Sequence, residues 1–359
     1  IPGARMSEPV QSWDFARDLN GNGTDEFLLP AVGGYQWIAS GADPSMQTVF
    51  LRGGVEVHLA RFFDRIDAEL TPHPPYLTDF NGNGRSDLIL ASRKTLRVYL
   101  QDAGGRFQAH AGAVLDLPFV INRSLNARLQ TPPDAPEALR LLWAGHADAD
   151  GHLDLIAQKF LSDGSVFDSR SEIRLYKGSA GAGADSPPVV FSESPDQRLL
   201  SEGLQAAFRI NEPGGRPVIT AVTTEVGLLK IVRVLLSGRV GLKVHHFAIG
   251  NAGIFRPEPV ARQEISLSFS FRAGSKALPV LQFEDFDRDG FPDFLTSRNA
   301  EALAIFPGVR SGLLGNGMLA TIEAPVPGDG ERVISGDANA DGFPDLLVSY
   351  DETDVEGRF

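Results

Sequence analysis

Residues 79–90 read DFNGNGRSDLIL, a run in which oxygen-bearing side chains alternate with glycines before an apolar segment begins. A surface turn needs only one or two Asp, Asn or Gly residues. Four of the first nine side chains here carry a carboxylate or an amide, namely Asp79, Asn81, Asn83 and Asp87. The glycines between them let the backbone curl through conformations that other residues resist. This density of oxygen atoms needs an explanation beyond a turn.

The same pattern occurs five times when the sequence is aligned on the glycine at the sixth position. The copies are DLNGNGTDEFLL (18–29), DFNGNGRSDLIL (79–90), HADADGHLDLIA (146–157), DFDRDGFPDFLT (285–296) and DANADGFPDLLV (337–348). Their starts are separated by 61, 67, 139 and 52 residues. Because the third spacing is about twice the others, a further copy is expected inside it. INEPGGRPVITA (210–221) fills that place, with the glycine kept and the oxygen-bearing side chains lost.

A second pattern follows the loops. Short runs rich in β-branched and aromatic residues end in Gly-rich material, which is typical of a strand entering a hairpin. One cycle spans about 50 to 75 residues, enough for about four short strands, and shows no helical periodicity. Four-stranded cycles of this length are typical of propeller blades. The runs are TVFLRGG (48–54), TLRVYLQDAGGRF (95–107), EIRLYKGSAGAG (172–183), LKVHHFAIGNAGIF (242–255) and ALAIFPG (302–308).

The nine-residue loop is interpreted as a set of ligand positions for a cation. Side-chain oxygens stand at the first, third, fifth and ninth positions, and the seventh offers its backbone carbonyl. Oxygen ligands without cysteine select a hard cation, and calcium, with 6 to 8 oxygens, fits better than magnesium. An EF-hand needs Glu at its twelfth position, and tandem nonapeptide loops recur every nine residues. The EF-hand pattern does not apply, because the twelfth residues are Leu29, Leu90, Ala157, Thr296 and Val348. The tandem pattern does not apply either, because the copies start 52 or more residues apart.

The pattern Asp-x-(Asp/Asn)-x-(Asp/Asn)-Gly-x-x-Asp before an apolar strand resembles the FG-GAP/VCBS repeats of integrin α-subunit propellers and of many bacterial surface proteins. The resemblance implies an all-β fold, a β-propeller of four-stranded blades that is commonly seven-bladed. Residues 1–359 are then one propeller domain, with six countable cycles whose loops start near 18, 79, 146, 210, 285 and 337. Ring closure is expected from the N-terminal segment IPGARMSEPV or from sequence beyond residue 359. Irregular insertions are expected at 121–138 and 183–203.

The resemblance also implies five candidate calcium loops. His146 stands at the first position of the third loop, where Asp is expected, and a neutral imidazole is a poor calcium ligand, so four to five ions are expected. The fourth loop has four carboxylates and is expected to bind most tightly. The candidate ligands are Asp18, Asn20, Asn22, Thr24 and Glu26; Asp79, Asn81, Asn83, Arg85 and Asp87; Asp148, Asp150, His152 and Asp154; Asp285, Asp287, Asp289, Phe291 and Asp293; and Asp337, Asn339, Asp341, Phe343 and Asp345.

Composition argues against several classes of function. The formal net charge of −13 disfavours binding to nucleic acid or an anionic membrane, and no apolar run approaches the roughly 20 residues of a membrane span. No cysteine is present for a disulfide, a thiolate metal site or a nucleophile. No Gly-x-Ser-x-Gly segment selects a catalytic triad.

We therefore expect a non-enzymatic, calcium-stabilised platform that binds a protein or glycan through one propeller face. An extracytoplasmic location (secreted, periplasmic or cell-surface) is expected because millimolar calcium fills even weak sites. The first residue, Ile1, is what a removed signal segment or a trimmed sequence would leave. The alternatives are a polysaccharide lyase or hydrolase on a propeller, and an architectural subunit of a larger surface assembly.

Overall fold

The computed structural model describes most of the chain. Its described residues form β-strands, one short 3-10 helix, η4 (Gly330–Arg332), and no α-helix, so the all-β class is confirmed. No described helix has the length and apolar character needed to cross a membrane. The described residues are 16–20, 24, 26–39, 48–61, 66–121, 138–161, 170–183, 187–202, 204–211, 217–224, 239–250, 253–268, 279–311, 313–315, 317–327, 329–337 and 341–350.

Four of the sheets contain four antiparallel strands arranged in chain order. Sheet 1 consists of β1 (Ala16–Arg17), β2 (Glu26–Ala31), β3 (Gly34–Ile38) and β4 (Thr48–Arg52). Sheet 2 consists of β7 (Tyr76–Thr78), β8 (Asp87–Ala91), β9 (Thr95–Tyr99) and β10 (Ala113–Asp116). Sheet 4 consists of β18 (Leu204–Asn211), β19 (Val218–Thr224), β20 (Arg239–Ala248) and β21 (Ala261–Ser268). Sheet 5 consists of β22 (Leu281–Glu284), β23 (Asp293–Asn299), β24 (Ala302–Phe306) and β25 (Ala320–Glu323).

The remaining sheets vary this plan. Sheet 3 contains β12 (Ala138–Gly145), β13 (Asp154–Leu161), β14 (Arg170–Tyr176) and β17 (Gln197–Glu202), with β11 (Val120–Ile121) added parallel to β12. Sheet 6 contains β26 (Val333–Gly336) and β27 (Asp345–Val348). Two separate hairpins are formed by β5 (Val55–Arg61) with β6 (Ile66–Pro72), and by β15 (Gly178–Ala180) with β16 (Val189–Phe191).

In each of the six numbered sheets, the strand that follows the loop begins at the ninth position of that loop. The prediction that a strand starts where the loop ends is therefore confirmed, including at the loop that lost its oxygen-bearing side chains. The starting residues are Glu26 (β2), Asp87 (β8), Asp154 (β13), Val218 (β19), Asp293 (β23) and Asp345 (β27). In sheets 2 to 5 the second pattern corresponds to the third strand and the hairpin after it, whereas TVFLRGG (48–54) forms the fourth strand of sheet 1, β4. The hairpin is closed in three sheets by an isolated bridge: Gln101–Phe107, Ile249–Phe255 and Gly308–Leu314.

Consecutive sheets pack face to face, and strand β8 shows why. Successive side chains of a strand point to opposite faces, and all five residues of β8 are buried. Leu88 and Leu90 pack with Trp37 of sheet 1, whereas Ile89 packs with Leu155 of sheet 3. A strand buried on both faces has a continuous apolar sequence instead of an alternating one.

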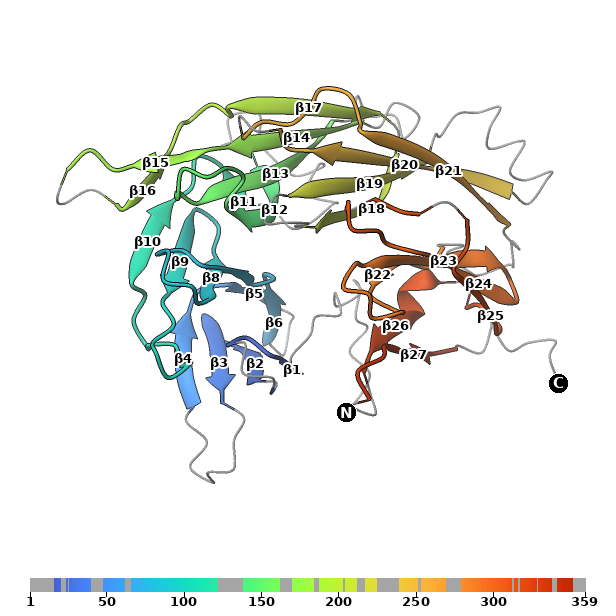
Figure 1. The fold of residues 1–359 in the computed structure, drawn as a ribbon. Helices are drawn as coiled ribbons and strands as arrows, with labels where there is room; N and C mark the ends of the chain where they lie inside the picture. Colours follow the sequence, from blue (N-terminus) through green and yellow to red (C-terminus); the bar gives the residue numbers. More distant parts are fainter. Residues whose placement is uncertain are drawn as a thin grey trace.

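The same packing continues along the chain. One apolar cluster joins sheets 3 and 4, a second joins sheets 4 and 5, and a third joins sheets 5 and 6. Figure 1 shows the six sheets following one another around an open arc, from the blue strands of sheet 1 to the red strands of sheet 6. The described residues contain six such sheets, and no seventh.

Both ends of the arc present apolar side chains on their outer faces. In sheet 1, Leu28 points toward sheet 2, while Phe27 and Phe50 on the opposite face are 43% and 40% exposed. In sheet 6, Val333 points toward sheet 5, while Leu347 on the opposite face is 69% exposed. The terminal sheets thus carry side chains suited to a further layer.

The two predicted insertions have different outcomes. The segment 183–203 is not a plain inserted loop, because it contains β16 and β17, and β17 forms the outer edge of sheet 3. Periodicity in QRLLSE is weak, and its pairing with β14 is what gives this segment a strand structure. For the segment 121–138, residues 122–137 lie outside the described part of the chain.

Candidate metal centre

The loop between β22 and β23 contains the best-formed cluster of oxygen ligands. Asp285, Asp287 and Asp289 can each place one carboxylate oxygen so that all three lie within 4.8 Å of one another. The backbone of the same loop holds these side chains in place. Gly290 N–H donates to Asp285 Oδ2 (2.9 Å), and Phe291 N–H donates to Asp289 Oδ1 (2.8 Å). Asp289 N–H in turn donates to Asp287 Oδ1 (3.1 Å).

One oxygen of this cluster lacks a partner. Asp285 Oδ1 is buried from solvent and accepts no hydrogen bond from the described residues. A buried carboxylate oxygen without a donor costs free energy, and a bound cation would remove that cost. The three side chains therefore fit a hard cation such as calcium, which takes carboxylate and backbone carbonyl oxygens in flexible geometry.

The backbone of this loop adopts the conformation that the motif requires. Gly290 has φ +86°, and Arg288 has φ +61°, which is unusual for a residue with a side chain. The Arg288 guanidinium donates from Nη1 to the carbonyl of Asp341 at 3.1 Å and lies 4.9 Å from the ring centre of Phe343. Loops four and five are therefore in direct contact.

Loops two and five share the arrangement at their first position. Asp79 accepts hydrogen bonds from Asn83 N–H (2.9 Å) and Gly84 N–H (2.7 Å). Asp337 accepts from Asp341 N–H (3.1 Å) and Gly342 N–H (2.7 Å). The side-chain oxygens of Asn81 and Asn83 each accept a hydrogen bond from the backbone N–H two residues later. Each carboxylate oxygen keeps a second lone pair, so these contacts leave room for a cation.

The first loop is described in part. Asp18, Asn20, Thr24 and Glu26 lie within the described residues, whereas Asn22 lies outside them, as does Asn339 of the fifth loop. Asn20 donates from Nδ2 to Glu26 Oε1 at 2.6 Å. Glu26 is fully buried, like Asp87, Asp154 and Asp293 at the same loop position.

The ninth-position carboxylate joins two parts of its own sheet. Asp87 Oδ2 accepts from Phe80 N–H (3.0 Å) at the start of the loop, and Oδ1 accepts from Gln101 N–H (2.8 Å) beyond the third strand. Asp293 makes the equivalent pair with Phe286 (2.9 Å) and Gly308 (2.6 Å). This two-sided contact, which we call the carboxylate clasp, was not predicted, because the N–H donors beyond the third strand have no side-chain signature.

Burial dominates the electrostatics of the clasps. It raises the pKa of Asp87 and of Asp293, and the nearby carboxylates Asp79, Asp285 and Asp287 act in the same direction. In sheet 3, burial raises the pKa of Asp154 to about 6. Backbone N–H donors oppose these shifts because they favour the ionised form.

The third loop differs from the others in its charges. His146 occupies the first position, with Nδ1 2.9 Å from the carbonyl oxygen of His152 and Nε2 2.9 Å from that of Asp79. The Lys177 ammonium lies 2.5 Å from Asp148 Oδ2. Burial would raise the pKa of Asp148, but the hydrogen bonds from Lys177 and from Asp150 N–H outweigh it, so this pKa lies below its usual range.

Lys177 was missed by sequence reasoning, although a signal was present. It directly precedes Gly178, whose N–H donates to Asp154 Oδ1 at 3.0 Å. The residues at the corresponding place in sheets 2 and 5 are Leu100 and Pro307, which precede the clasp donors Gln101 and Gly308. A lysine among apolar counterparts marks the third loop as different.

The contacts of the seventh-position residues involve their side chains or their backbone N–H groups. Arg85 turns its side chain away, donating from Nε to the carbonyl of Gln101 at 3.2 Å. The backbone N–H of Phe291 donates to the carboxylate of Asp289, and that of Phe343 donates to the carboxylate of Asp341.

No protein-family model matches this chain, and the comparison with curated proteins also returned no match.

Proposed function

We propose that this chain is a calcium-stabilised β-propeller of the FG-GAP/VCBS kind, which serves as an extracytoplasmic platform for a protein or glycan ligand. The observation that carries the calcium assignment is the fourth loop, where three carboxylates converge and Asp285 Oδ1 is buried without a donor. The ion would hold the connection between the first two strands of a sheet, so its role is structural.

The propeller part of the proposal is supported by the way the sheets stack. Four-stranded sheets in chain order, packed face to face around an arc, have the arrangement of propeller blades (Figure 1). The apolar outer faces of sheets 1 and 6 favour one further sheet between them, which would make seven blades. Closing the ring would bury Phe27, Phe50 and Leu347, which the described residues leave exposed.

The non-enzymatic part of the proposal is supported by where the ionisable groups lie. The described carboxylates with raised pKa values, Asp87, Asp154 and Asp293, are held by backbone N–H groups inside the clasps. A catalytic pair would need an acid and a base converging on an open site. These three instead lie in different sheets and face backbone donors.

The main experiment measures bound calcium and thermal stability together. Protein purified in calcium is expected to carry four to five ions per chain, and chelation with EGTA is expected to lower the melting temperature on the order of 10 °C, because several sites each contribute about 2–3 kcal/mol when nearly saturated. Asp289→Ala should remove one ion. Protein without bound calcium, melting at the same temperature in EGTA, would contradict the proposal.

The ligand-binding role needs its own measurement. The calcium-loaded chain is immobilised and presented with panels of glycans and extracellular-matrix proteins, and binding that disappears in EGTA is expected. Turnover of any polysaccharide in the panel would instead favour a lyase or hydrolase. A chain that binds nothing alone and purifies in a stable surface complex would favour an architectural subunit.

A further inference from the structure

The third loop contains the same nine positions as the fourth, but protein groups contact the positions where an ion would sit. At the first position the fourth loop has Asp285, with an oxygen that lacks a donor. The third loop has His146 there, and its Nδ1 lies 2.9 Å from the carbonyl oxygen of His152. That carbonyl is the seventh-position ligand, so the imidazole covers two of the five positions.

The third position is also engaged. Asp148 Oδ1 accepts from Asp150 N–H at 3.0 Å, and its Oδ2 lies 2.5 Å from the Lys177 ammonium. In the fourth loop only Oδ1 of the equivalent residue, Asp287, receives a hydrogen bond from the described residues. The ammonium therefore lies on the oxygen that an ion would use.

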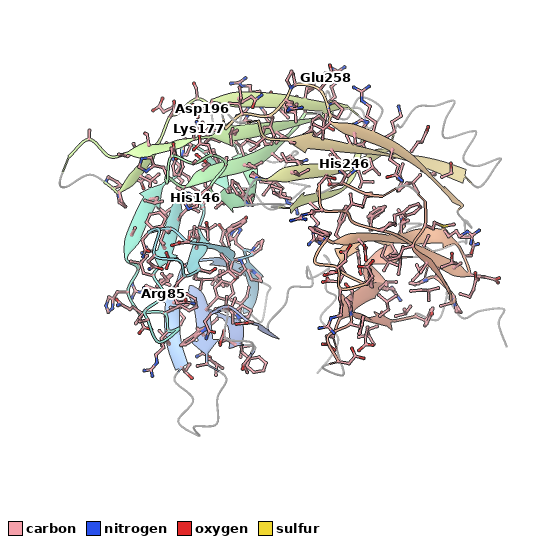
Figure 2. All side chains as sticks on the ribbon, in the orientation of Figure 1. Arg85, His146, Lys177, Asp196, His246 and Glu258 are labelled. Carbon is pink, nitrogen blue, oxygen red and sulfur yellow. The ribbon has the colours of Figure 1, made fainter. Side chains whose placement is uncertain are left out.

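The backbone holds Lys177 in this place. Its own N–H donates to Asp196 Oδ2 at 2.7 Å, and the next residue, Gly178, donates to Asp154. Figure 2 shows Lys177 and Asp196 close together beside the green strands of sheet 3, with His146 below them, on the side of sheet 2. The hydrogen bond to Asp148 raises the pKa of Lys177, and the charges of Asp148, Asp154 and Asp150 contribute to this shift. Of the acidic ligands of the loop, Asp148 forms the ion pair with this ammonium group.

The contact lies at the joint between sheets 3 and 4. The hairpin after β20 packs Gly253 against Asp148, so closely that a Cβ atom at Gly253 would overlap the carboxylate. Beside it, the Gln197 side-chain amide bonds the backbone of Phe255 in both directions, accepting at Oε1 (2.5 Å) and donating from Nε2 (2.6 Å). Within sheet 4, the loop at 210–218 connects β18 to β19, and its ninth residue is the apolar Val218.

We propose that the Lys177 ammonium replaces calcium in the third loop, with His146 filling the first ligand position. Sheets 3 and 4 then form a calcium-independent centre of the protein, flanked by calcium-dependent sheets on both sides. This inference rests on the proposed function only in that the other loops are taken to bind calcium, and it narrows the expected number of ions from four to five down to four.

Calcium counting tests the replacement directly. Asp150→Ala is expected to leave the number of bound ions unchanged, whereas Asp289→Ala in the fourth loop removes one. If Asp150→Ala removes an ion, the third loop binds calcium and the inference fails. If neither variant changes the count because no ion is bound, the proposed function fails instead, and the two failures are distinguishable.

Creating the missing site is the stronger test. The double variant His146→Asp with Lys177→Met restores the first ligand and removes the ammonium, while methionine keeps most of the apolar stem. It is expected to bind one additional calcium ion per chain, and its melting temperature should rise with added calcium more than that of the wild type. The single variant Lys177→Met should melt lower without gaining an ion. A double variant that folds and gains no ion would overturn the assignment.

Hydrogen exchange on the wild-type protein gives a reading that needs no variant to fold. In EGTA, the amides of Asp150 and His152 are expected to stay protected. Lys177 still pairs with Asp148, the acceptor of the Asp150 amide, and so keeps the loop in which His152 N–H donates to Asp150. The corresponding amides of Asp289 and Phe291 should lose protection. Equal loss of protection in both loops would show that the ammonium does not replace the ion.

Discussion

The backbone N–H of Gln101, just beyond β9, donates a 2.8 Å hydrogen bond to Oδ1 of Asp87, the first residue of the neighbouring strand β8. Together with Phe80 N–H on the other oxygen, this contact ties the loop, the second strand and the hairpin after the third strand to one buried carboxylate. The clasp therefore connects three parts of its sheet through hydrogen bonds alone, and it fixes the end of the candidate metal loop.

The first prediction concerns this clasp. Asp87→Ala leaves two buried N–H groups without an acceptor, and the expected loss in the free energy of unfolding is about 3 kcal/mol. Asp87→Asn keeps one acceptor and should lose less. Asp116→Ala, an exposed residue of β10 in the same sheet, is the matched control and should stay within about 0.5 kcal/mol.

Urea unfolding is measured for the three variants both in calcium and in EGTA. The clasp acts through hydrogen bonds alone, so the loss at Asp87→Ala should persist in EGTA. A loss that vanishes when calcium is removed would mean that Asp87 stabilises the sheet only as a metal ligand.

The second prediction concerns the close approach of sheets 3 and 4. Gly253 has φ +68° and lies directly against Asp148, whereas Gly317 has φ +93° and open space around the position of a Cβ. Alanine at either position meets similar backbone strain, but only Gly253→Ala also displaces a carboxylate. Gly253→Ala is expected to cost about 1–3 kcal/mol more than Gly317→Ala. Thermal melts of both variants check this, and equal losses of stability would show that sheets 3 and 4 are not closely packed at Gly253.

The third prediction concerns ring closure. Leu347 is 69% exposed in the described structure and lies on the outer face of sheet 6. If a seventh sheet covers this face, Leu347→Asp buries a charge and should cost at least about 2 kcal/mol. Val32→Asp is the control, because Val32 is 71% exposed in the turn between β2 and β3. If urea unfolding shows that neither substitution changes the free energy of unfolding, the arc is open and no seventh sheet covers Leu347.

The fourth prediction concerns pH. Burial lowers the pKa of His246 to about 4, and the neighbouring His245 contributes to this shift. The ordinary pKa of histidine is about 6.5, so between pH 6.5 and 4 the unfolded chain binds more protons than the folded one. Stability from this residue is present above pH 6.5 and is lost as the pH falls, by roughly 3 kcal/mol at pH 4.

Other groups titrate in the same range, so the measurement compares two proteins. Asp154, with its pKa raised to about 6, acts in the opposite direction, and it contributes equally to the wild type and to His246→Gln. The advantage of the wild type over this variant in the free energy of unfolding should shrink from pH 7 to pH 4. Stability curves that run parallel across this range would mean that His246 is accessible to protons in the folded state.

Features that depend on neighbouring residues could be read from the local sequence. The loop conformation follows from contacts such as Arg85 N–H to Asn83 Oδ1, which join residues two apart. The strand starts at Asp87 and Asp293 follow from the change from polar to apolar side chains. Local hydrogen bonds and local burial patterns act over a few residues, and for this reason the all-β class and all six strand starts could be predicted.

The tertiary structure alone decided which groups meet across strands and between sheets. The strand status of β17 came from pairing with β14, and the partners of the clasps came from the register beyond the third strands. The ion pair between Lys177 and Asp148 depends on the pairing of β13 with β14, which brings the end of β14 beside the third loop. Contacts between residues distant in sequence depend on how the sheets fold and pack, so a local pattern can mark a residue as unusual but does not specify its partner.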